Sequence, residues 1–115
     1  MPPRPCPVAA AVDLVHSRWT TPVLWNLDHR GPLRFSQLQR HIGDISPKTL
    51  TERLRHLERH GLVTRTYHPE IPPRVEYAIT PLGRSLAPLF TALTAWQDRH
   101  LPAVEAARRA YDAAD

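Results

Sequence analysis

The chain has 115 residues, of which 42% are hydrophobic and 23% charged; this suits a soluble globular domain with one core and is too short for two such domains. The net charge is +4 at pH 7, and there is no apolar stretch long enough for a membrane span or for the core of a signal peptide. We therefore expect no transmembrane helix and no export, and predict a single cytoplasmic domain over residues 1–115.

The positive charge is concentrated in the middle of the chain. Residues 30–84 hold ten Lys and Arg against five Asp and Glu, whereas residues 1–29 are balanced and residues 85–115 carry one excess negative charge. A localised basic excess is typical of a surface that binds a polyanion. An ordinary solvated surface has the same signature, so charge alone leaves both interpretations open.

Two helices are expected in the N-terminal part. Residues 1–5 should form a disordered arm, and Pro7 can begin a first helix with Cys6 near its N-cap. A second helix is predicted over residues 18–29, with Ser17 as its N-cap.

Residues 35–60 predict a helix-turn-helix. Ser36 is expected to cap a short helix, and Ser46 with Pro47 to start the next one, because serine is a favoured N-cap and proline fits the first helical position. Gly61 stands where a helix often ends on glycine. Two helices joined by a turn of about four residues form the DNA-binding motif of many regulators.

The next segment predicts a wing over residues 62–79. Polar and apolar residues alternate over 62–68, a second strand is expected over 74–79, and the proline-rich loop at 69–73 cannot be a helix or a central strand. Residues 33–35 form a separate short extended piece. Strand, loop and strand read as a hairpin with a stiff tip.

The C-terminal part predicts helices over residues 81–113. Thr80 is expected to cap a helix that Pro88 kinks and that Pro102 breaks or restarts. One side of this helix is apolar, which fits either a dimer interface or an ordinary core face; its members are Leu82, Leu86, Leu89, Leu93 and Trp96.

A helical wheel on the second helix of the helix-turn-helix separates an inward leucine side from a charged side. Recognition helices place their N-terminal half in the major groove, where Lys and Arg reach guanine or phosphate. Glu52 could accept from cytosine N4 or pair with Arg55 or Arg59, and a solvated helix face is the alternative for all of them. The candidate DNA-binding residues on this helix are Ser46, Lys48, Thr49, Thr51, Glu52, Arg55 and Arg59.

The predicted wing carries Arg65, His68 and Arg74. Wing cations often contact phosphates or the minor groove, and His68 and Arg74 complete the candidate DNA-binding set. The alternative for Arg74 is an ion pair with Glu70 or Glu76.

Several stretches together resemble the HxlR-type winged helix-turn-helix regulators, relatives of the MarR-like group. They are CPV at 6–8, RWT at 18–20, GPLRFSQL at 31–38, ISPKTLT at 45–51, LRHLE at 54–58, GLV at 61–63, PPRVEY at 72–77 and LG at 82–83. The resemblance implies a mainly α fold with a small β-hairpin. It also implies a homodimer that joins through its first and last helices and binds roughly palindromic double-stranded operator DNA.

Cys6 is a candidate redox sensor, because some members of that family sense oxidants, quinones or aldehydes through a cysteine in the matching Cys-Pro position. A thiol at a helix N-cap faces the positive end of the helix dipole, which favours the reactive thiolate. Since the chain has one cysteine, the options are Cys6 pairing between protomers, a mixed disulfide or alkylation. An inert cap or core cysteine is the alternative.

No cofactor, metal site or catalytic constellation is expected. His56 and His60 share a helix face, but no cysteine partner or His-Glu-x-x-His pattern accompanies them. A small-molecule effector is a further candidate partner, with a pocket between the first helices and the last. A winged-helix module that binds proteins instead of DNA and a small enzyme are the other functions considered.

Overall fold

The computed structural model describes residues 6–114, in two compact units, Met1–Ser85 and Leu86–Asp115. The predicted disordered arm at residues 1–5 lies outside the described residues, and the single-domain organisation stays a prediction. The elements of the first unit are α1 (Ala9–Val15), α2 (Thr20–Arg30), β1 (Leu33–Arg34), α3 (Phe35–Ile42), α4 (Pro47–Arg59), β2 (Val63–His68), β3 (Arg74–Ile79) and α5 (Pro81–Arg84). The second unit is the helix α6 (Ala87–Ala113).

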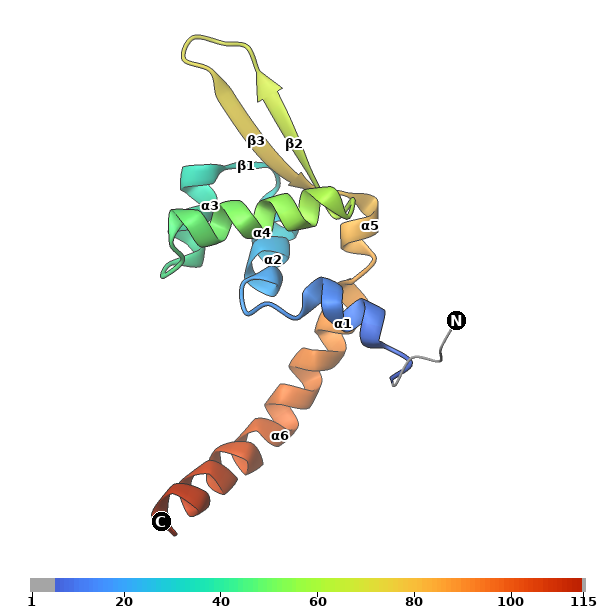
Figure 1. Ribbon diagram of the computed structural model, residues 1–115, viewed down its shortest axis with the longest axis vertical. Helices are drawn as coiled ribbons and strands as arrows, with labels where there is room; N and C mark the ends of the chain where they lie inside the picture. The colour runs from blue at the N-terminus through green and yellow to red at the C-terminus, as the bar shows by residue number, and fades with distance from the viewer. Residues whose placement is uncertain (1–5, 115) are drawn as a thin grey trace. The chain divides into compact units, whose positions relative to one another are not determined.

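The expected mainly α winged-helix architecture is confirmed, with one strand more than the hairpin. β2 and β3 form the antiparallel hairpin, which projects from the helices of the first unit (Figure 1). β1, the extended piece before α3, pairs antiparallel with β3, Leu33 opposite Tyr77, so the sheet order is β1-β3-β2. This pairing joins segments far apart in the chain, which local pattern does not reveal.

α4 begins and ends where its sequence signals stand. Ser46 Oγ accepts a hydrogen bond from the Thr49 N–H at 3.1 Å, and Pro47 occupies the first helical position. Gly61 follows the helix with φ +77°, a left-handed conformation that glycine adopts without strain.

The predicted starts of α1, α2 and α3 are each wrong by two residues. The N-cap of α1 is Val8 instead of Cys6, and the N-cap of α2 is Trp19 instead of Ser17. Ser17 Oγ accepts a hydrogen bond from the Trp19 N–H, so it bonds the N-cap residue itself and not an N–H inside the helix. α3 starts at Phe35 because Gln37 Oε1 accepts from the backbone N–H of Arg34 at 2.9 Å, which leaves Ser36 inside the helix.

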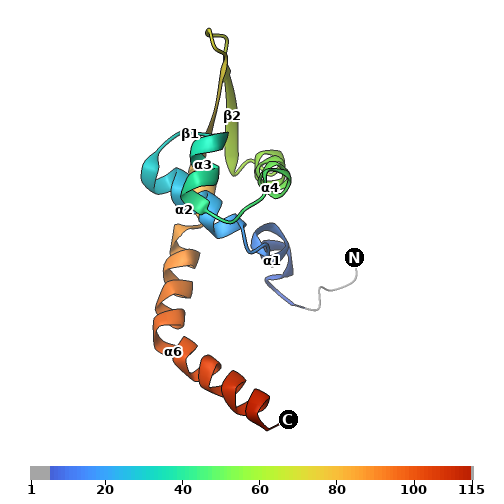
Figure 2. The same ribbon diagram turned by 90° about the vertical axis from the view of Figure 1, so that its left-hand side faces the viewer.

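The prolines near the C-terminus act differently from the prediction. Thr80 caps a helix as expected, with its side chain accepting from the Gly83 N–H, but α5 ends at Arg84. Pro88 lacks the N–H that would bond the Arg84 carbonyl, so it stands at the start of α6 instead of kinking one long helix. Pro102 does not break α6, which bends along its length (Figure 2).

The core of the first unit lies where α2, α3 and α4 meet the sheet. α4 contributes the leucine side predicted from its wheel, and α2 contributes Val23, Leu24 and Leu27. The buried hydrophobic residues are Val23, Leu24, Leu27, Leu33, Leu38, Ile45, Leu50, Leu54, Leu57, Leu62, Val63 and Ile79. Across residues 6–114, no helix is long and apolar enough to cross a membrane.

The foot of the wing is tied to the end of α4. The N–H of Leu62 donates to the Leu57 carbonyl at 2.9 Å, and Thr80 donates through its side chain to the Gly61 carbonyl at 2.6 Å. Gly83 packs so closely against this junction that a Cβ there would lie 2.4 Å from the Leu62 carbonyl oxygen. These contacts hold the hairpin at a defined place beside α4, which Figure 2 shows nearly end-on.

Candidate nucleic-acid interface

The charged side of α4 is exposed, as its wheel predicts. Its residues, with the half-buried Thr51 at the flank, are Lys48, Glu52, Arg55 and Arg59; we call these five residues the exposed face of α4. Among residues 6–114, none of the five takes part in an ion pair, so Glu52 pairs with neither Arg55 nor Arg59. The cations and the carboxylate are therefore all available to a ligand.

Ser46 and Thr49 are engaged with each other at the start of α4. Besides accepting from the Thr49 N–H, Ser46 Oγ donates to Thr49 Oγ1 at 3.0 Å. Both residues stand at the N-terminus of the helix, where the positive end of the dipole attracts a phosphate. Their contribution to a DNA surface would come through this helix end and not through freely rotating hydroxyls.

Loss of the Ser46 cap is expected to lower the free energy of unfolding by about 1 kcal/mol in Ser46→Ala, because the Thr49 N–H loses its acceptor. Ser46→Asn keeps an acceptor at the cap and should stay close to the wild type. Urea denaturation followed by circular dichroism measures both variants. Equal stability of Ser46→Ala and Ser46→Asn would contradict the capping role.

The tip of the wing holds a cluster of opposite charges. Arg74 lies between two carboxylates, 3.1 Å from Glu70 and 3.1 Å from Glu76. The contact with Glu70 is a hydrogen bond, whereas Arg74 Nε approaches Glu76 without an aligned one. His68 Nε2 also lies 3.1 Å from Glu76 Oε1. We call these four residues the wing cluster; both predicted DNA-binding residues of the wing are thus paired with acids.

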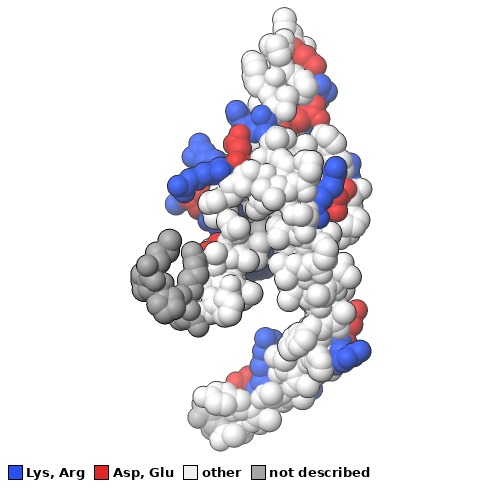
Figure 3. All heavy atoms as spheres, turned by 90° about the vertical axis from the view of Figure 1, so that its right-hand side faces the viewer, with Lys and Arg blue, Asp and Glu red and all other residues white. Residues whose placement is uncertain are grey.

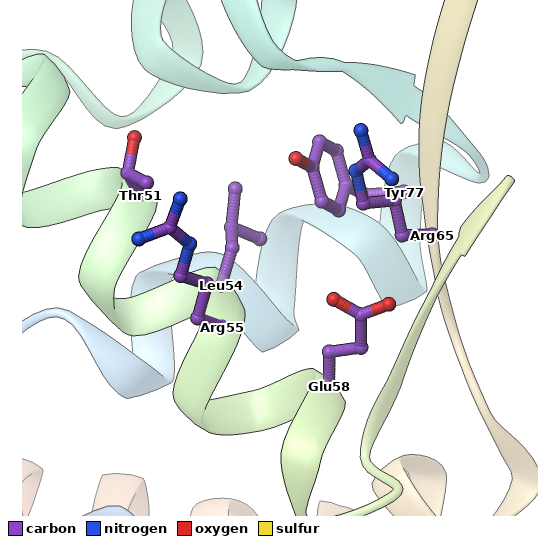
Figure 4. Close-up of a pocket in the computed structure, with 6 residues that line it drawn as sticks. All are labelled: Thr51, Leu54, Arg55, Glu58, Arg65 and Tyr77. Carbon is purple, nitrogen blue, oxygen red and sulfur yellow. The ribbon is translucent and has the colours of Figure 1, made fainter. Parts of the chain in front are cut away.

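A hollow of about 380 Å³ lies between α4 and the wing. Four of its lining residues come from α4 and two from the strands, and their side chains face a common space (Figure 4). The lining residues are Thr51, Leu54, Arg55, Glu58, Arg65 and Tyr77; we call this hollow the wing groove. It contains two members of the exposed face of α4.

Arg65, Glu58 and Tyr77 are absent from the DNA-binding set predicted from the sequence, although the sequence places Arg65 among the cations of the wing. The alternation of β2 places Arg65 on the same side as the buried Val63, which is the side toward the helices. That signal could have assigned Arg65 to the groove. Tyr77 could not have been found locally, because the strand register places it opposite Arg65.

The basic excess of the middle segment does not form a uniform patch on the face shown in Figure 3. Lys and Arg side chains gather there in several places, with Asp or Glu beside most of them. Three ion pairs between arginine and a carboxylate occur among residues 6–114, besides the contact of His68 with Glu76, and one of the three joins Arg84 on α5 to Asp28 on α2. A cation that is already paired with an acid is weak evidence for a site that binds a polyanion. The evidence for such a site therefore comes from the cations on α4 and β2 that have no ion-pair partner among the described residues.

Cys6 is exposed and lies in a turn before α1, with its carbonyl accepting from the Ala9 N–H at 3.2 Å. It is not the N-cap, so the helix-dipole argument for its reactivity does not apply, and it is not a core cysteine. The other end of α1 is bonded to α4. His56 Nε2 lies 3.2 Å from the Leu14 carbonyl oxygen, and since a carbonyl only accepts, the ring nitrogen is the donor.

The rings of His56 and His60 lie side by side, with centroids 4.5 Å apart and their planes tilted by 48°. His60 also approaches the His56 carbonyl through Nδ1, at 2.7 Å. Within residues 6–114, no group of three or more His, Cys, Asp or Glu side chains is placed to hold a metal ion.

Three comparisons with known proteins agree with this geometry. The profile of the HxlR-like helix-turn-helix family matches residues 14–105. An uncharacterized HTH-type transcriptional regulator of Methanothermobacter thermautotrophicus is 44% identical over 91 residues, which cover 79% of this chain and 69% of the relative.

Two solved structures of similar fold are regulators studied in defined redox states. The reduced form of the transcriptional regulator YodB from B. subtilis has a TM-score of 0.74 and 36% identity, covering 84% of this chain and 94% of its own. The redox regulator HypR in its reduced form has a TM-score of 0.79 and 30% identity, covering 88% of this chain and 99% of its own.

Proposed function

Because the chain belongs to the HxlR-like helix-turn-helix family of DNA-binding transcriptional regulators, we propose that it is a homodimer that recognises a roughly palindromic operator in the cytoplasm. The observation that carries the proposal is the exposed face of α4, which begins at a capped helix N-terminus and holds three cations with no ion-pair partner among residues 6–114. Proteins of this family are regulators and not enzymes, so the alternative of a small enzyme is excluded.

The exposed face of α4 has the chemistry of a recognition helix. Lys48 and Arg55 are about two helical turns apart on one side, so both can lie in one major groove. There, each can donate to guanine acceptors or to phosphates. Thr51 and Glu52 between them add a hydroxyl and a carboxylate that can read bases. With Ser46, Thr49 and Arg59, they make up the α4 contribution that we propose.

The apolar side of α6 supports the dimer. The described part of this 27-residue helix has no buried residue. Leu89, Leu93 and Trp96 are 39%, 52% and 54% exposed, and at about 100° per residue they share one side of the helix. A second copy of the chain that covers this side would remove a continuous apolar surface from water. The predicted N-terminal contribution fits as well, since Val8 and Val12 are exposed.

Fluorescence anisotropy tests the proposal directly. Wild-type protein is titrated onto the labelled DNA upstream of its own gene and onto a scrambled duplex of the same composition, over a series of salt concentrations. We expect tighter binding to the native duplex, and affinity that falls steeply with salt as counterions are released. A protein that binds neither duplex, but retains a protein partner independently of salt, would support the protein-interaction alternative instead.

A second proposal concerns Cys6 as a redox or electrophile sensor. It is supported by the exposure of the thiol and by the likeness to HypR, a redox regulator solved in reduced and oxidized forms. The bond from His56 to the Leu14 carbonyl connects the helix after Cys6 to α4. Joining two Cys6 thiols across the dimer, or alkylating one, would act on α1 and through that bond on the recognition helix.

We expect diamide or a quinone to release the wild-type protein from its operator duplex, and Cys6→Ser to stay bound under the same treatment. Anisotropy follows the release, and mass spectrometry of the treated protein identifies the Cys6 product. Dithiothreitol should restore binding after diamide, since a disulfide is reducible. Identical responses of the wild type and Cys6→Ser would disprove the sensing role. A small-molecule effector stays a separate prediction.

A further inference from the structure

The wing presents its cations in two different electrostatic settings. At the tip, Arg74 has a carboxylate oxygen 3.1 Å away on each of two sides, and the wing cluster includes two acids for its one arginine. A phosphate approaching this cluster meets two negative charges, and Arg74 would have to exchange existing partners for the new one. The tip is therefore a poor phosphate site, whatever its sequence pattern predicts.

At the foot of the wing, Arg65 is in the opposite situation. It is exposed, and among residues 6–114 it takes part in no ion pair. It lines the wing groove with Arg55 of α4, so two guanidinium groups from different elements border one hollow. Figure 4 shows Arg65 and Tyr77 on one side of this space and Thr51 with Arg55 on the other.

From this arrangement we infer that the wing groove receives a backbone phosphate of the bound DNA, and that Arg65, not Arg74, is the main phosphate contact of the wing. The inference rests on the proposed function and deepens it, since it assigns the second half of the DNA contact to a residue outside the predicted set. Arg65 and Arg55 would hold the phosphate between recognition helix and wing.

The groove has the charge and the donors for one phosphodiester. Arg55 and Arg65 with Glu58 leave a net charge of +1, which balances the single negative charge of a phosphodiester group. The guanidinium groups match the paired oxygens of a phosphate in geometry. The hydroxyls of Thr51 and Tyr77 are further donors at the same hollow. A phosphate held there would also fix the angle between the duplex and α4.

A double-mutant cycle with neutralised phosphates tests the inference. Each phosphate of the upstream duplex is replaced in turn by an uncharged methylphosphonate, and affinity is measured for the wild type, Arg65→Ala and Arg84→Ala. Arg84 is the matched control, because it is an arginine of the same unit that is already paired, with Asp28 at 3.3 Å. Arg74→Ala is measured in the same way for comparison.

We expect Arg65→Ala to weaken binding to native and scrambled duplexes alike, by on the order of tenfold, because the substitution removes a charged hydrogen bond to a phosphate. The slope of log K against log salt should become shallower by about 0.9, since one phosphate fewer is neutralised. At one position, the methylphosphonate should lower the affinity of the wild type for the duplex, but it should not lower the affinity of Arg65→Ala further. Arg84→Ala should keep the wild-type slope and the wild-type pattern.

The inference is overturned if Arg65→Ala keeps the wild-type salt slope. It is also overturned if the loss of affinity from a methylphosphonate is non-additive with Arg74→Ala and not with Arg65→Ala. In either case the wild type still binds its duplex, and the proposed function stands without the inference. Failure of the wild type to bind any duplex overturns both. Circular dichroism of Arg65→Ala verifies that the exposed substitution leaves the fold intact, and Arg65→Gln serves as a second neutral variant.

Discussion

Replacement of Leu93 by aspartate is expected to convert the proposed dimer to a monomer and to weaken binding to the proposed operator by about 10²- to 10⁴-fold. Leu93 lies at the centre of the apolar side of α6 and is 52% exposed in the single chain. A dimer would bury it, and an unpaired carboxylate buried there costs several kcal/mol. The loss of affinity follows because two linked recognition helices bind far more tightly than one.

Size-exclusion chromatography with light scattering measures the oligomeric state, and anisotropy measures the affinity. Ala95→Asp is the matched control, because it introduces the same charge on the same helix, about 200° around from Leu93, where the residue is also exposed. Ala95→Asp should stay dimeric and bind normally. A Leu93→Asp protein that remains a dimer would place the interface elsewhere on the chain.

Substitutions on α4, the proposed recognition helix, should give the second large effect on DNA binding. Lys48→Ala and Arg55→Ala are each expected to weaken operator binding by about 1–3 kcal/mol, that is, roughly 5- to 150-fold. Because the two residues are about 10 Å apart along α4, their effects should add approximately in the double variant. Neither side chain takes part in an ion pair among residues 6–114, so folding should be unaffected.

Binding to the scrambled duplex distinguishes contacts with bases from contacts with phosphates. A variant that removes a base-reading side chain should lose affinity for the operator and not for the scrambled sequence, whereas one that removes a phosphate contact should lose affinity for both. Arg84→Ala is again the control for the change in net charge. Unchanged affinity in both Lys48→Ala and Arg55→Ala would mean that α4 is not the recognition helix.

The two experiments on α6 and α4 together distinguish the ways in which DNA binding can fail. Loss of binding with an intact dimer identifies a contact with DNA, and loss of binding with a monomer identifies the dimer interface. The Cys6 experiment adds regulation to the same scheme. If oxidant releases DNA from a protein that remains dimeric, the change acts on the arrangement of the two recognition helices and not on assembly.

Local signals in the sequence were reliable where one segment satisfies its own backbone. The start and the end of α4 follow from Ser46, Pro47 and Gly61. A capping side chain, a proline at the first helical position and a left-handed glycine each act on backbone groups only a few residues away. The hairpin strands and the leucine side of α4 followed from periodicity for the same reason. Ser36 failed as a cap because Gln37, three residues beyond Arg34, satisfies the helix start instead.

Proline position was the other source of error. The sequence shows that Pro88 cannot donate a backbone hydrogen bond. It does not show whether the helix kinks at Pro88 or ends before it and a new helix begins. In the structure, α5 ends at Arg84 and α6 begins at Ala87, which places Pro88 where no donor is needed. Pro102 lies inside α6, which continues past it to Ala113.

The sequence by itself determined the winged helix-turn-helix class, the limits of α4 and the charged side that α4 exposes, because periodicity and capping are properties of neighbouring residues. Only the tertiary structure decided which cations are available. Ion pairs and strand register join residues across turns and between strands, so pairing occupies Arg74 at the wing tip and leaves Arg65 unpaired beside Arg55 among the residues that the structure describes. Whether a cation at a surface is unpaired depends on the charged groups within a few ångströms of it in space. Separation along the sequence does not show which groups those are.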